Sequence, residues 1–350
     1  MIHNKILQED VKNFAHKFAL ANELNGKTIA VTGATGLLGS CMVRCLLALH
    51  TEKGIDLHVI AVVRNIEKAA RLFGKECKEL SFYTYDFSST KAFKPSKKTD
   101  FIVHFAAPTA SKCFINKPVE TMNTIYFGTQ NILSYSQETK VTSLVFVSSM
   151  EVYGAITDDK ETLTEQMQGY LDPMATRSSY PLAKRAAEAL CHNFAVEHAV
   201  PVKVARLAQT FGAGVDSNDN RVFAQFARSV IHNQNIVLHT NGEGCHSYCY
   251  TTDAVSAMLY LLLRGEDGEA YNVANSETYI SIRKMAELVA ESFNPNNVKV
   301  VIQLQEGMGY PPTTKLRLDT KRIHALGWKA EFGLKEMFSR LIDSMKEIDS

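Results

Sequence analysis

Short apolar runs alternate with amphipathic stretches through the first 210 residues of the chain. Continuous apolar runs at 57–63, 101–105 and 144–147 predict buried parallel strands, because a strand covered on both faces has few polar positions. Helical spacing follows each run, and this alternation predicts an α/β fold with a doubly wound, Rossmann-type parallel sheet. The less regular remainder predicts a smaller, mixed α/β domain.

The predicted elements extend this picture along the whole chain. Strands are expected at 28–31, 57–63, 80–85, 101–105, 144–147 and 236–238. Helices are expected at 4–24, 37–50, 66–73, 119–137, 180–198, 219–233, 252–264, 281–293 and 334–348, the last two as surface helices. We therefore divide the chain into an N-terminal helix (1–25), a first domain (26–210, with a return near 245–265) and a second domain (211–350).

Composition and charge exclude several classes of partner. The chain has 350 residues, 45% of them apolar, and 38 basic against 37 acidic side chains, so no overall field favours nucleic acid or an anionic membrane. The polar N-terminus and the lack of a run of eighteen apolar residues predict no targeting segment, no membrane span and a cytoplasmic location. The seven cysteines lack paired metal-ligand spacing, so we expect reduced thiols and no metal site.

Three glycines, Gly33, Gly36 and Gly39, stand three residues apart between the first predicted strand and the next helix. In a dinucleotide-binding turn the first glycine closes the bend, the second lets the backbone approach a pyrophosphate, and the third lets helix and strand pack closely. The rest of this expected site is the backbone of Thr35, Leu37 and Leu38. A glycine turn that serves packing alone is the alternative.

The ends of the next strands add candidate cofactor contacts. The second strand runs into Arg64 and Asn65, where an NAD site usually has an acidic residue for the ribose. A guanidinium suits a 2′-phosphate, so Arg64 favours NADP, and a solvated arginine that opens the next helix is the alternative. The other expected contacts are Asp86 and Phe87 after the third strand, where the carboxylate could accept from adenine, and the small Ala106 and Ala107 after the fourth.

A tyrosine and a lysine after the fifth predicted strand suggest a catalytic site. Tyr180 and Lys184 are four positions apart, hence on one face of a helix, and Pro181 marks its first turn, so we expect Tyr180 to face out of the scaffold. An ammonium near a phenol favours the phenolate, which could remove a proton from a hydroxyl while hydride leaves the same carbon. The same pair occurs by chance on ordinary helices, but its place after the fifth strand of a glycine-turn sheet favours catalysis.

At these residues the chain resembles the extended short-chain dehydrogenase/reductases of the NAD-dependent epimerase/dehydratase family. The motifs that carry the resemblance are the glycine turn, His104 to Ala107, Gly128-Thr129, Ser149 with Tyr180 and Lys184, and Leu326 to Trp328. The resemblance implies that Ser149 hydrogen-bonds the reacting hydroxyl, that Tyr180 is the base, and that Lys184 holds the cofactor ribose. It also implies bound NAD(P), with NAD typical of the family, and a nucleotide-diphosphate sugar oxidised at C4 to a transient ketone.

Within the family the chain is most similar to UDP-glucuronate decarboxylases and nucleotide-sugar 4,6-dehydratases. The stretches that carry this similarity are 118–121, Arg177-Ser178, 220–223 and 246–250. Glu151 matches an acidic residue of those enzymes, and chemistry at C5 beside a C4 ketone needs such a carboxylate as base or proton shuttle. An ion pair between Glu151 and a nearby arginine is the alternative. The substrate contacts that the resemblance implies are Thr109, Ser111, Arg177, Gln209, Arg221 and His246.

Several positions depart from the family pattern around the cofactor and the substrate. Ile125 stands where dinucleotide sites of the family commonly have an asparagine, and Gln209 and Ala213 replace an asparagine and a proline. His246 replaces a pyrophosphate-binding arginine and is charged only part of the time near neutral pH. Arg221 is therefore expected to carry more of the substrate's charge.

The expected activity is oxidation of a nucleotide sugar at C4, followed by epimerisation or decarboxylation. Dehydration is less favoured, because Met150 stands where dehydratases carry a proton-donating aspartate, and a thioether cannot supply a proton. Two alternatives stay open: one-way NADPH-dependent reduction of a small carbonyl, and a non-catalytic dinucleotide sensor on the same fold. We also expect a homodimer through helices 119–137 and 180–198, and a loop at Pro311-Pro312 that borders the substrate pocket.

Overall fold

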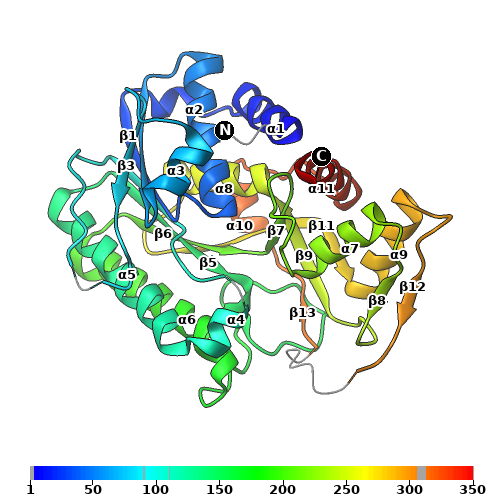
Figure 1. The fold of residues 1–350 in the computed structure, drawn as a ribbon. Coiled ribbons are helices and arrows are strands. Elements are labelled where there is room, and N and C mark those ends of the chain that lie inside the picture. The colour runs from blue at the N-terminus through cyan, green and yellow to red at the C-terminus, as the bar shows by residue number, and fades with distance from the viewer. Residues whose placement is uncertain (1–3, 90, 110, 306–312, 350) are drawn as a thin grey trace.

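The computed structural model describes residues 4–89, 91–109, 111–305 and 313–349, so Pro311 and Pro312 lie outside the described residues. Its centre is a seven-stranded parallel sheet in the order β10-β6-β5-β4-β1-β2-β3 (Figure 1). The strands are β1 (Lys27–Thr32), β2 (Leu57–Val63), β3 (Leu80–Thr84), β4 (Phe101–His104), β5 (Ser143–Ser149), β6 (Val202–Leu207) and β10 (Ala270–Val273). The strand order reverses between β1 and β4, which makes their carboxyl ends the expected ligand crevice. The Rossmann-type fold predicted from the sequence is confirmed.

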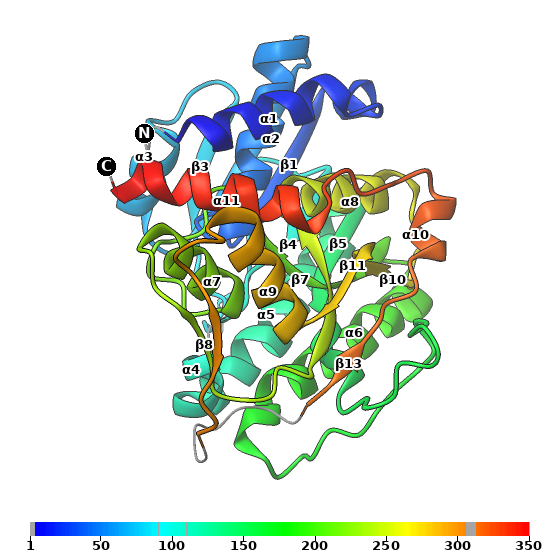
Figure 2. The ribbon, with the colours of Figure 1, turned by 90° about the vertical axis from the view of Figure 1, so that its right-hand side faces the viewer.

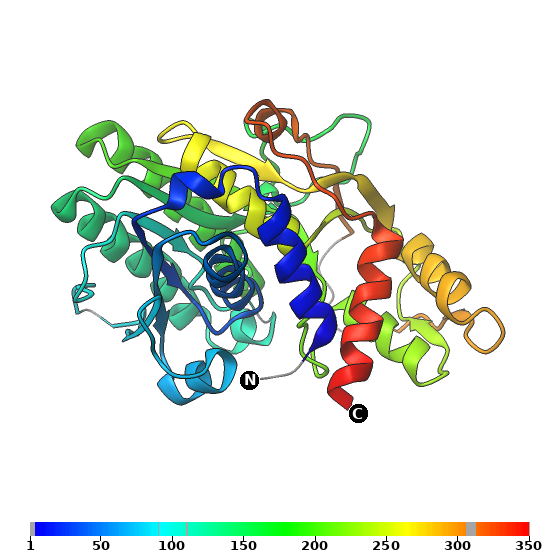
Figure 3. The same ribbon diagram turned by 90° about the horizontal axis from the view of Figure 1, so that it is seen from above.

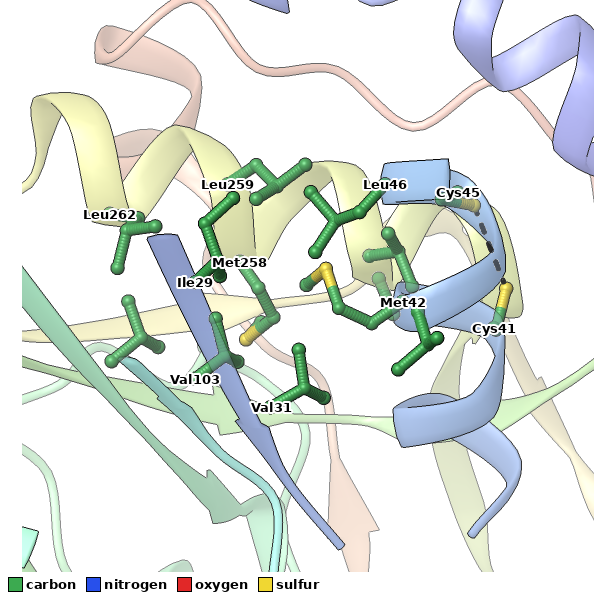
Figure 4. Packing of buried hydrophobic residues seen from close by; sticks show 14 of the residues in the cluster. Ile29, Val31, Cys41, Met42, Cys45, Leu46, Val103, Met258, Leu259 and Leu262 are labelled. Atoms are coloured by element: carbon green, nitrogen blue, oxygen red, sulfur yellow. Dashed lines mark hydrogen bonds between the residues drawn. The ribbon is translucent and has the colours of Figure 1, made fainter. Parts of the chain in front are cut away.

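Helices cover both faces of the central sheet. On one face lie α2 (Leu37–Lys53) and α8 (Thr251–Arg264), and on the other α5 (Pro118–Thr139) and α6 (Ser179–His198). Figure 4 shows Val31 of β1 among side chains of α2 and α8, including Met42 and Met258. Its neighbour Ala30 belongs to the opposite cluster, as expected for alternating strand positions. Packing on both faces thus fixes the strand ends that carry the candidate site.

A smaller α/β unit lies beside the central sheet (Figure 2). Its strands are β7 (Gln209–Phe211), β8 (Ile236–Leu238), β9 (Cys245–Tyr250), β11 (Asn275–Ser281), β12 (Val300–Ile302) and β13 (Lys315–Leu316). Its helices are α7 (Val222–Ile231), α9 (Ile282–Phe293) and α11 (Leu334–Asp349). α9 and α11 keep an exposed face, as predicted for surface helices, and bury the other, since Met285 of α9 and Phe338 of α11 lie in a core with Phe223 of α7.

The N-terminal helix braces the two units against each other. α1 (Lys5–Lys17) is shorter than predicted, because the chain turns extended at Phe18, whose ring is buried, and continues as the short helix η1 (Ala21–Leu24). α1 packs on α2 and α8 and lies beside α11 (Figure 3). Its buried Asp10 carboxylate accepts hydrogen bonds from Tyr250 Oη of β9 and from Arg340 Nε of α11, the latter at 2.5 Å.

Other differences from the sequence prediction are local. The helix predicted at 219–233 begins only at Val222, because the Asp219 carboxylate accepts from the backbone N–H of Arg221 and holds a turn there. The segment predicted to return to the first domain, residues 245–265, contributes to both units, since β9 joins the second sheet and α8 covers the first. The domain boundaries themselves stay a prediction. The remaining short elements are α3 (Ile66–Phe73), α4 (Ser111–Asn116), η2 (Met150–Tyr153), η3 (Thr176–Ser178) and α10 (Lys321–Ala325).

Within the described ranges, no helix combines the length and the apolarity that crossing a bilayer requires.

Candidate functional site

The glycine turn closes the carboxyl end of β1 as tightly as the sequence suggested. Gly33 has a φ of +62°, a conformation that glycine adopts without strain. A Cβ on Gly39 would lie 2.2 Å from the carbonyl oxygen of Gly33, so only glycine allows α2 to start this close to the turn. Gly36, at the N-cap of α2, is exposed, and the neighbouring Leu37 and Leu38 belong to the first turn of the helix. The turn therefore presents backbone N–H groups at a helix N-terminus.

The facing wall of the crevice follows β4 and is tied to β1. Thr32 Oγ1 accepts a hydrogen bond from the Ala106 backbone N–H at 3.1 Å and lies 2.8 Å from His104 Nδ1. A Cβ on Gly33 would approach Ala106 N to 3.1 Å, so the two strand ends nearly touch. Burial lowers the pKa of His104 to about 3, which keeps the imidazole neutral. Ala106 and Ala107, both half-buried, line this wall as predicted candidates.

Arg64 and Asp86 lie near each other at the ends of β2 and β3. Both are exposed, and Arg64 helps to lower the pKa of Asp86, although the larger cause is the hydrogen bond from the Ser88 backbone. The Asn65 side chain caps α3 by accepting from the Lys68 N–H at 2.8 Å, so its amide oxygen is already engaged.

Phe87 is placed differently from what a cofactor-binding side chain would need. Its ring is 4% exposed and packs against Tyr85, with centroids 4.8 Å apart, and against His104, with centroids 5.0 Å apart. A Cβ on Gly128 of α5 would lie 3.1 Å from Phe87 Cβ, so this ring sets the distance between α5 and the sheet. Only the Phe87 backbone is left to contact a ligand.

Ser149, Tyr180 and Lys184 are brought together at the ends of β5 and α6. Ser149 is the last residue of β5, and its hydroxyl is close enough to Tyr180 to lower the pKa of that phenol. Lys184 Nζ donates to the carbonyl oxygen of Val147 at 2.7 Å and lies 5.8 Å from the centroid of the Tyr180 ring. The ammonium lies 4.6 Å from the centroid of Phe146, so an aromatic face and a carbonyl hold it in place.

Tyr180 does not face out of the scaffold, because it is only 7% exposed. Its ring stacks on that of Phe114 in α4, with centroids 4.4 Å apart and planes inclined by 14°. Burial, followed by the charge of Glu151, raises the pKa of Tyr180, while Ser149 and Arg177 act in the opposite direction. Burial also lowers the pKa of Lys184 to about 8. Burial therefore acts against the lowered phenol pKa that we expected Lys184 to cause.

Glu151 forms the ion pair that was the alternative interpretation of this residue. Arg177 Nη2 lies 2.9 Å from Glu151 Oε2, and both side chains are about one-third exposed at the edge of the site, at 29% and 34%. The Arg177 guanidinium also lies 4.9 Å from the centroid of Phe114, whose other face is covered by Tyr180. The pair therefore connects two candidate residues and leaves both accessible.

The remaining predicted substrate contacts are scattered. Thr109 is exposed after β4, Ser111 is the first residue of α4, and Gln209 begins β7 beside Tyr248. Arg221 is exposed and forms an ion pair with Asp219 at 2.5 Å.

His246 differs from the expectation of a partly charged group. Burial lowers its pKa to about 4, so the imidazole is neutral at physiological pH. His246 Nε2 lies 3.0 Å from Thr314 Oγ1, whereas Nδ1 has no hydrogen-bond partner in the part of the chain that the structure describes. His246 therefore cannot replace the charge of a pyrophosphate-binding arginine, so among the predicted substrate contacts Arg177 and Arg221 are the cations.

Sequence reasoning missed three residues beside the site: Phe114, Glu188 and Arg206. Phe114 belongs to a six-residue helix without a strong periodic signal. Glu188 follows Lys184 by four positions on α6, and this spacing could have revealed it. Arg206 on β6 forms an ion pair with Glu188 at 2.7 Å, a long-range contact that no local pattern encodes.

The described residues fit a bound dinucleotide. Gly36 is exposed at the glycine turn and has no side chain, and its backbone lies at the N-terminus of α2, where anions bind. An ammonium has three N–H donors, and Lys184 uses one of them, on Val147, in the residues described. Gly33, Gly36 and Lys184 would hold the diphosphate and a ribose, and the nicotinamide would supply the hydride acceptor.

The strand order and the crevice place the chain among dinucleotide-binding α/β proteins. The model of the NAD dependent epimerase/dehydratase family matches residues 29–274, so the chain belongs to this family. This confirms the family resemblance inferred from the motifs.

Three known proteins illustrate the similarity. UDP-glucuronic acid decarboxylase 1 of Xenopus tropicalis is 25% identical over 345 residues, covering 96% of this chain and 78% of the relative. dTDP-D-glucose 4,6-dehydratase of Homo sapiens is 24% identical over 327 residues, covering 92% and 90%. The crystal structure of UDP-glucuronic acid 4-epimerase from Bacillus cereus, in complex with UDP-glucuronic acid and NAD, has a TM-score of 0.76 at 17% identity and covers 92% of this chain and 99% of its own. This likeness in structure concerns the fold.

Proposed function

We propose that this chain is an NAD(P)-dependent enzyme that oxidises a nucleotide-diphosphate sugar at C4 to a transient 4-ketone. The observation that carries the proposal is the convergence of Ser149, Tyr180 and Lys184 beside the glycine-turn crevice. Ser149 would hold the C4 hydroxyl, Tyr180 would take its proton, and Lys184 would orient the cofactor ribose. The names of the two relatives given above, a UDP-glucuronic acid decarboxylase and a dTDP-D-glucose 4,6-dehydratase, support the substrate class.

The second step is proposed to be epimerisation or decarboxylation. Glu151 and Arg177 lie at the edge of the site, where a carboxylate could move a proton at C5 and a guanidinium could meet an acidic group of the sugar. Dehydration is disfavoured, because Met150 is 4% exposed and its thioether has no proton to give to a leaving hydroxyl.

The test is incubation of the purified protein with UDP-glucuronate, UDP-glucose and dTDP-glucose in separate reactions. Nuclear magnetic resonance of the products distinguishes a pentose with released CO₂, a C4 epimer, and a 4-keto-6-deoxy sugar. Tyr180→Phe should abolish product, whereas Tyr170→Phe, at a 69% exposed tyrosine, should not. Product formation by Tyr180→Phe at the wild-type rate would overturn the proposal.

The same assay separates the two alternatives. A one-way carbonyl reductase consumes NADPH in proportion to product, whereas an epimerase or decarboxylase returns its cofactor to the starting state. A dinucleotide sensor would bind the cofactor and convert no sugar. The convergence of three groups with complementary catalytic roles favours the enzyme over the sensor.

Arg64 leads us to propose a preference for NADP over NAD, although the family pattern favours NAD. The guanidinium is exposed at the end of β2, where a 2′-phosphate would lie, and its positive charge supports the proposal. The Asp86 carboxylate beside it acts in the opposite direction, because it would repel that phosphate. Comparison of the two dissociation constants decides between the cofactors.

We also propose a cytoplasmic homodimer with a role in polysaccharide biosynthesis, since nucleotide sugars are the donors for that process. The cysteines are free thiols, as reducing conditions require. The neighbouring helices α5 and α6 expose apolar side chains at Met122, Phe127 and Val196, with exposures of 42%, 51% and 73%. Analytical ultracentrifugation should find a dimer for the wild type and a monomer for Phe127→Glu.

A further inference from the structure

A buried ion pair lies one helical turn beyond Lys184. The Glu188 carboxylate on α6 accepts hydrogen bonds from Arg206 Nε and Nη2 at 3.0 and 2.7 Å, and from Ser148 Oγ at 2.5 Å. Glu188 is 9% exposed, so the pair is almost fully withdrawn from solvent. Ser148 directly precedes Ser149, and Glu188 therefore contacts both chain segments that carry the proposed catalytic residues.

The other side of Arg206 reaches the segment that follows the site. Its Nη1 donates to the carbonyl oxygen of Glu165 at 2.7 Å and to Tyr153 Oη at 3.3 Å. Tyr153 Oη in turn donates to Asn272 Oδ1 of β10 at 2.7 Å. The Arg206 guanidinium thus joins α6 to the segment that begins with Glu151. Its hydrogen bonds on both sides hold it beside Glu188.

Lys184 itself is not paired with Glu188. No contact within 4.0 Å joins its Nζ to a carboxylate in the described part of the chain, although Glu188 follows it by one turn. The Glu188 oxygens are engaged by Arg206 and Ser148, so the ammonium keeps donors for a ligand.

We propose that Glu188 and Arg206 are a positioning pair for the active site: Glu188 supplies the negative charge that the buried Lys184 needs, and Arg206 holds that charge too far away to capture the ammonium. Without Arg206, Glu188 is expected to turn toward Lys184 and occupy its free donors. Without Glu188, the ammonium is left in an apolar environment among aromatic rings. The importance of this arrangement for turnover rests on the proposed function.

The groups around Lys184 agree with this assignment. On α6 they are Tyr180, Glu188 and Cys191, and from β4 comes His104. Burial raises the pKa of Cys191 and lowers that of His104, so both are neutral near pH 7. Burial lowers the pKa of Lys184, and Glu188 is the largest influence that raises it. Loss of the Glu188 charge is therefore expected to lower the pKa of Lys184.

The experiment follows the ionisation of Lys184 directly, through the ¹³Cε chemical shift of labelled lysine, assigned with Lys184→Arg. Glu188→Gln should move the titration midpoint about one pH unit lower. Arg206→Gln, which leaves Glu188 unpaired, should move it about one unit higher. Opposite shifts are not expected of a pair that only stabilises the fold. Glu269→Gln is the matched control, since it breaks the ion pair at 2.9 Å between Arg322 of α10 and Glu269, the residue before β10, and it should leave the midpoint unchanged.

Isothermal titration of NAD⁺ and NADP⁺ between pH 7 and 9.5 gives a second readout. The pH at which affinity falls should move with the Lys184 midpoint in each variant. If neither single variant folds, Glu188→Met with Arg206→Met removes both charges, a change that buried pairs often tolerate. This double variant should titrate lower than the wild type. An unchanged Lys184 midpoint in Glu188→Gln or in the double variant would overturn the inference, whereas failure of the wild type to bind either dinucleotide would overturn the proposed function alone.

Discussion

The ring of Tyr180 lies flat against the ring of Phe114, with centroids 4.4 Å apart, and the Arg177 guanidinium lies near the opposite face of Phe114. This stack buries the proposed catalytic phenol. Through Phe114 it also connects Tyr180 to the Arg177–Glu151 ion pair. A ligand that displaces Arg177 from Glu151 would therefore alter both candidate proton-transfer groups, because Glu151 raises the pKa of Tyr180 and Arg177 lowers it.

Replacing Tyr180 by phenylalanine should remove the proton acceptor without disturbing the stack. We expect the rate of C4 oxidation to fall by about 10²–10⁴-fold, with the dissociation constant for NAD(P) nearly unchanged. Single-turnover absorbance at 340 nm and calorimetric titration measure the two quantities. Weaker cofactor binding at an unaltered rate would contradict the role of Tyr180.

Replacing Glu151 by glutamine should separate the two chemical steps. The amide can neither accept nor supply a proton at C5, so we expect oxidation at C4 to continue while a later step that moves this proton, as in decarboxylation, slows by about 10²-fold or more. Reduced cofactor should then accumulate, as seen at 340 nm. Uniform loss of both steps would mean that Glu151 serves only to hold Arg177.

Replacing Arg64 by alanine should affect one cofactor more than the other. A charge-assisted hydrogen bond to a 2′-phosphate contributes about 1.5–3 kcal/mol, so the NADP dissociation constant should rise by about 10–100-fold. The NAD constant should change much less. Equal changes for NADP and NAD would assign Arg64 to the solvated surface.

Replacing Gly39 by alanine should disturb the start of α2, because the new Cβ would meet the Gly33 carbonyl oxygen at 2.2 Å. We expect a loss of about 1–3 kcal/mol in unfolding free energy, together with weaker cofactor binding. Gly333→Ala, where no atom lies within 4 Å of the added Cβ, is the control for urea unfolding. A Gly39→Ala protein as stable as Gly333→Ala would disprove the steric argument.

Acid should destabilise the protein through its neutral histidines. Burial lowers the pKa values of His104 and His246 to about 3 and about 4, below the unfolded value of about 6.5. Their contribution to stability is thus complete above pH 6.5 and is lost as the pH falls toward these folded values. At pH 5 each contributes about 2 kcal/mol less than at pH 7.5.

Urea unfolding of His246→Gln at these two pH values checks this expectation. The stability difference between pH 7.5 and 5 should be about 2 kcal/mol smaller than in the wild type. His232→Gln, a substitution at an exposed histidine, is the matched control. Identical pH dependence in His246→Gln and the wild type would refute the argument.

The sequence was informative where the signal is local. The strand at Leu57–Val63 and the helix at Ile66–Phe73 match their predicted bounds, because apolar periodicity and flanking caps define both. β10 was missed, since four residues after an ordinary turn carry little periodic signal and only pairing with β6 makes them a strand. α9 and α11 have the exposed face expected of surface helices, but amphipathicity does not show which segments cover their apolar faces.

In the candidate site, too, local features could be predicted from the sequence, whereas burial and long-range contacts could not. Spacing identified Tyr180 and Lys184, the family resemblance added Ser149, and the structure brings these three together. Burial was not foreseeable from spacing, so the neutral state of His246 and the cover of Phe114 over Tyr180 emerge only from the fold. Long-range pairs such as Glu188–Arg206 join segments whose proximity depends on the strand order.

The placement of α1 has a practical consequence for anyone who shortens this protein. A version starting near Gly26 would keep every residue of the family match but would remove Asp10, the acceptor for both Tyr250 and Arg340. The Tyr250 hydroxyl and the Arg340 guanidinium would then lose the carboxylate that they share where α11 and β9 meet. Such trimming is expected to yield an insoluble or loosely assembled product.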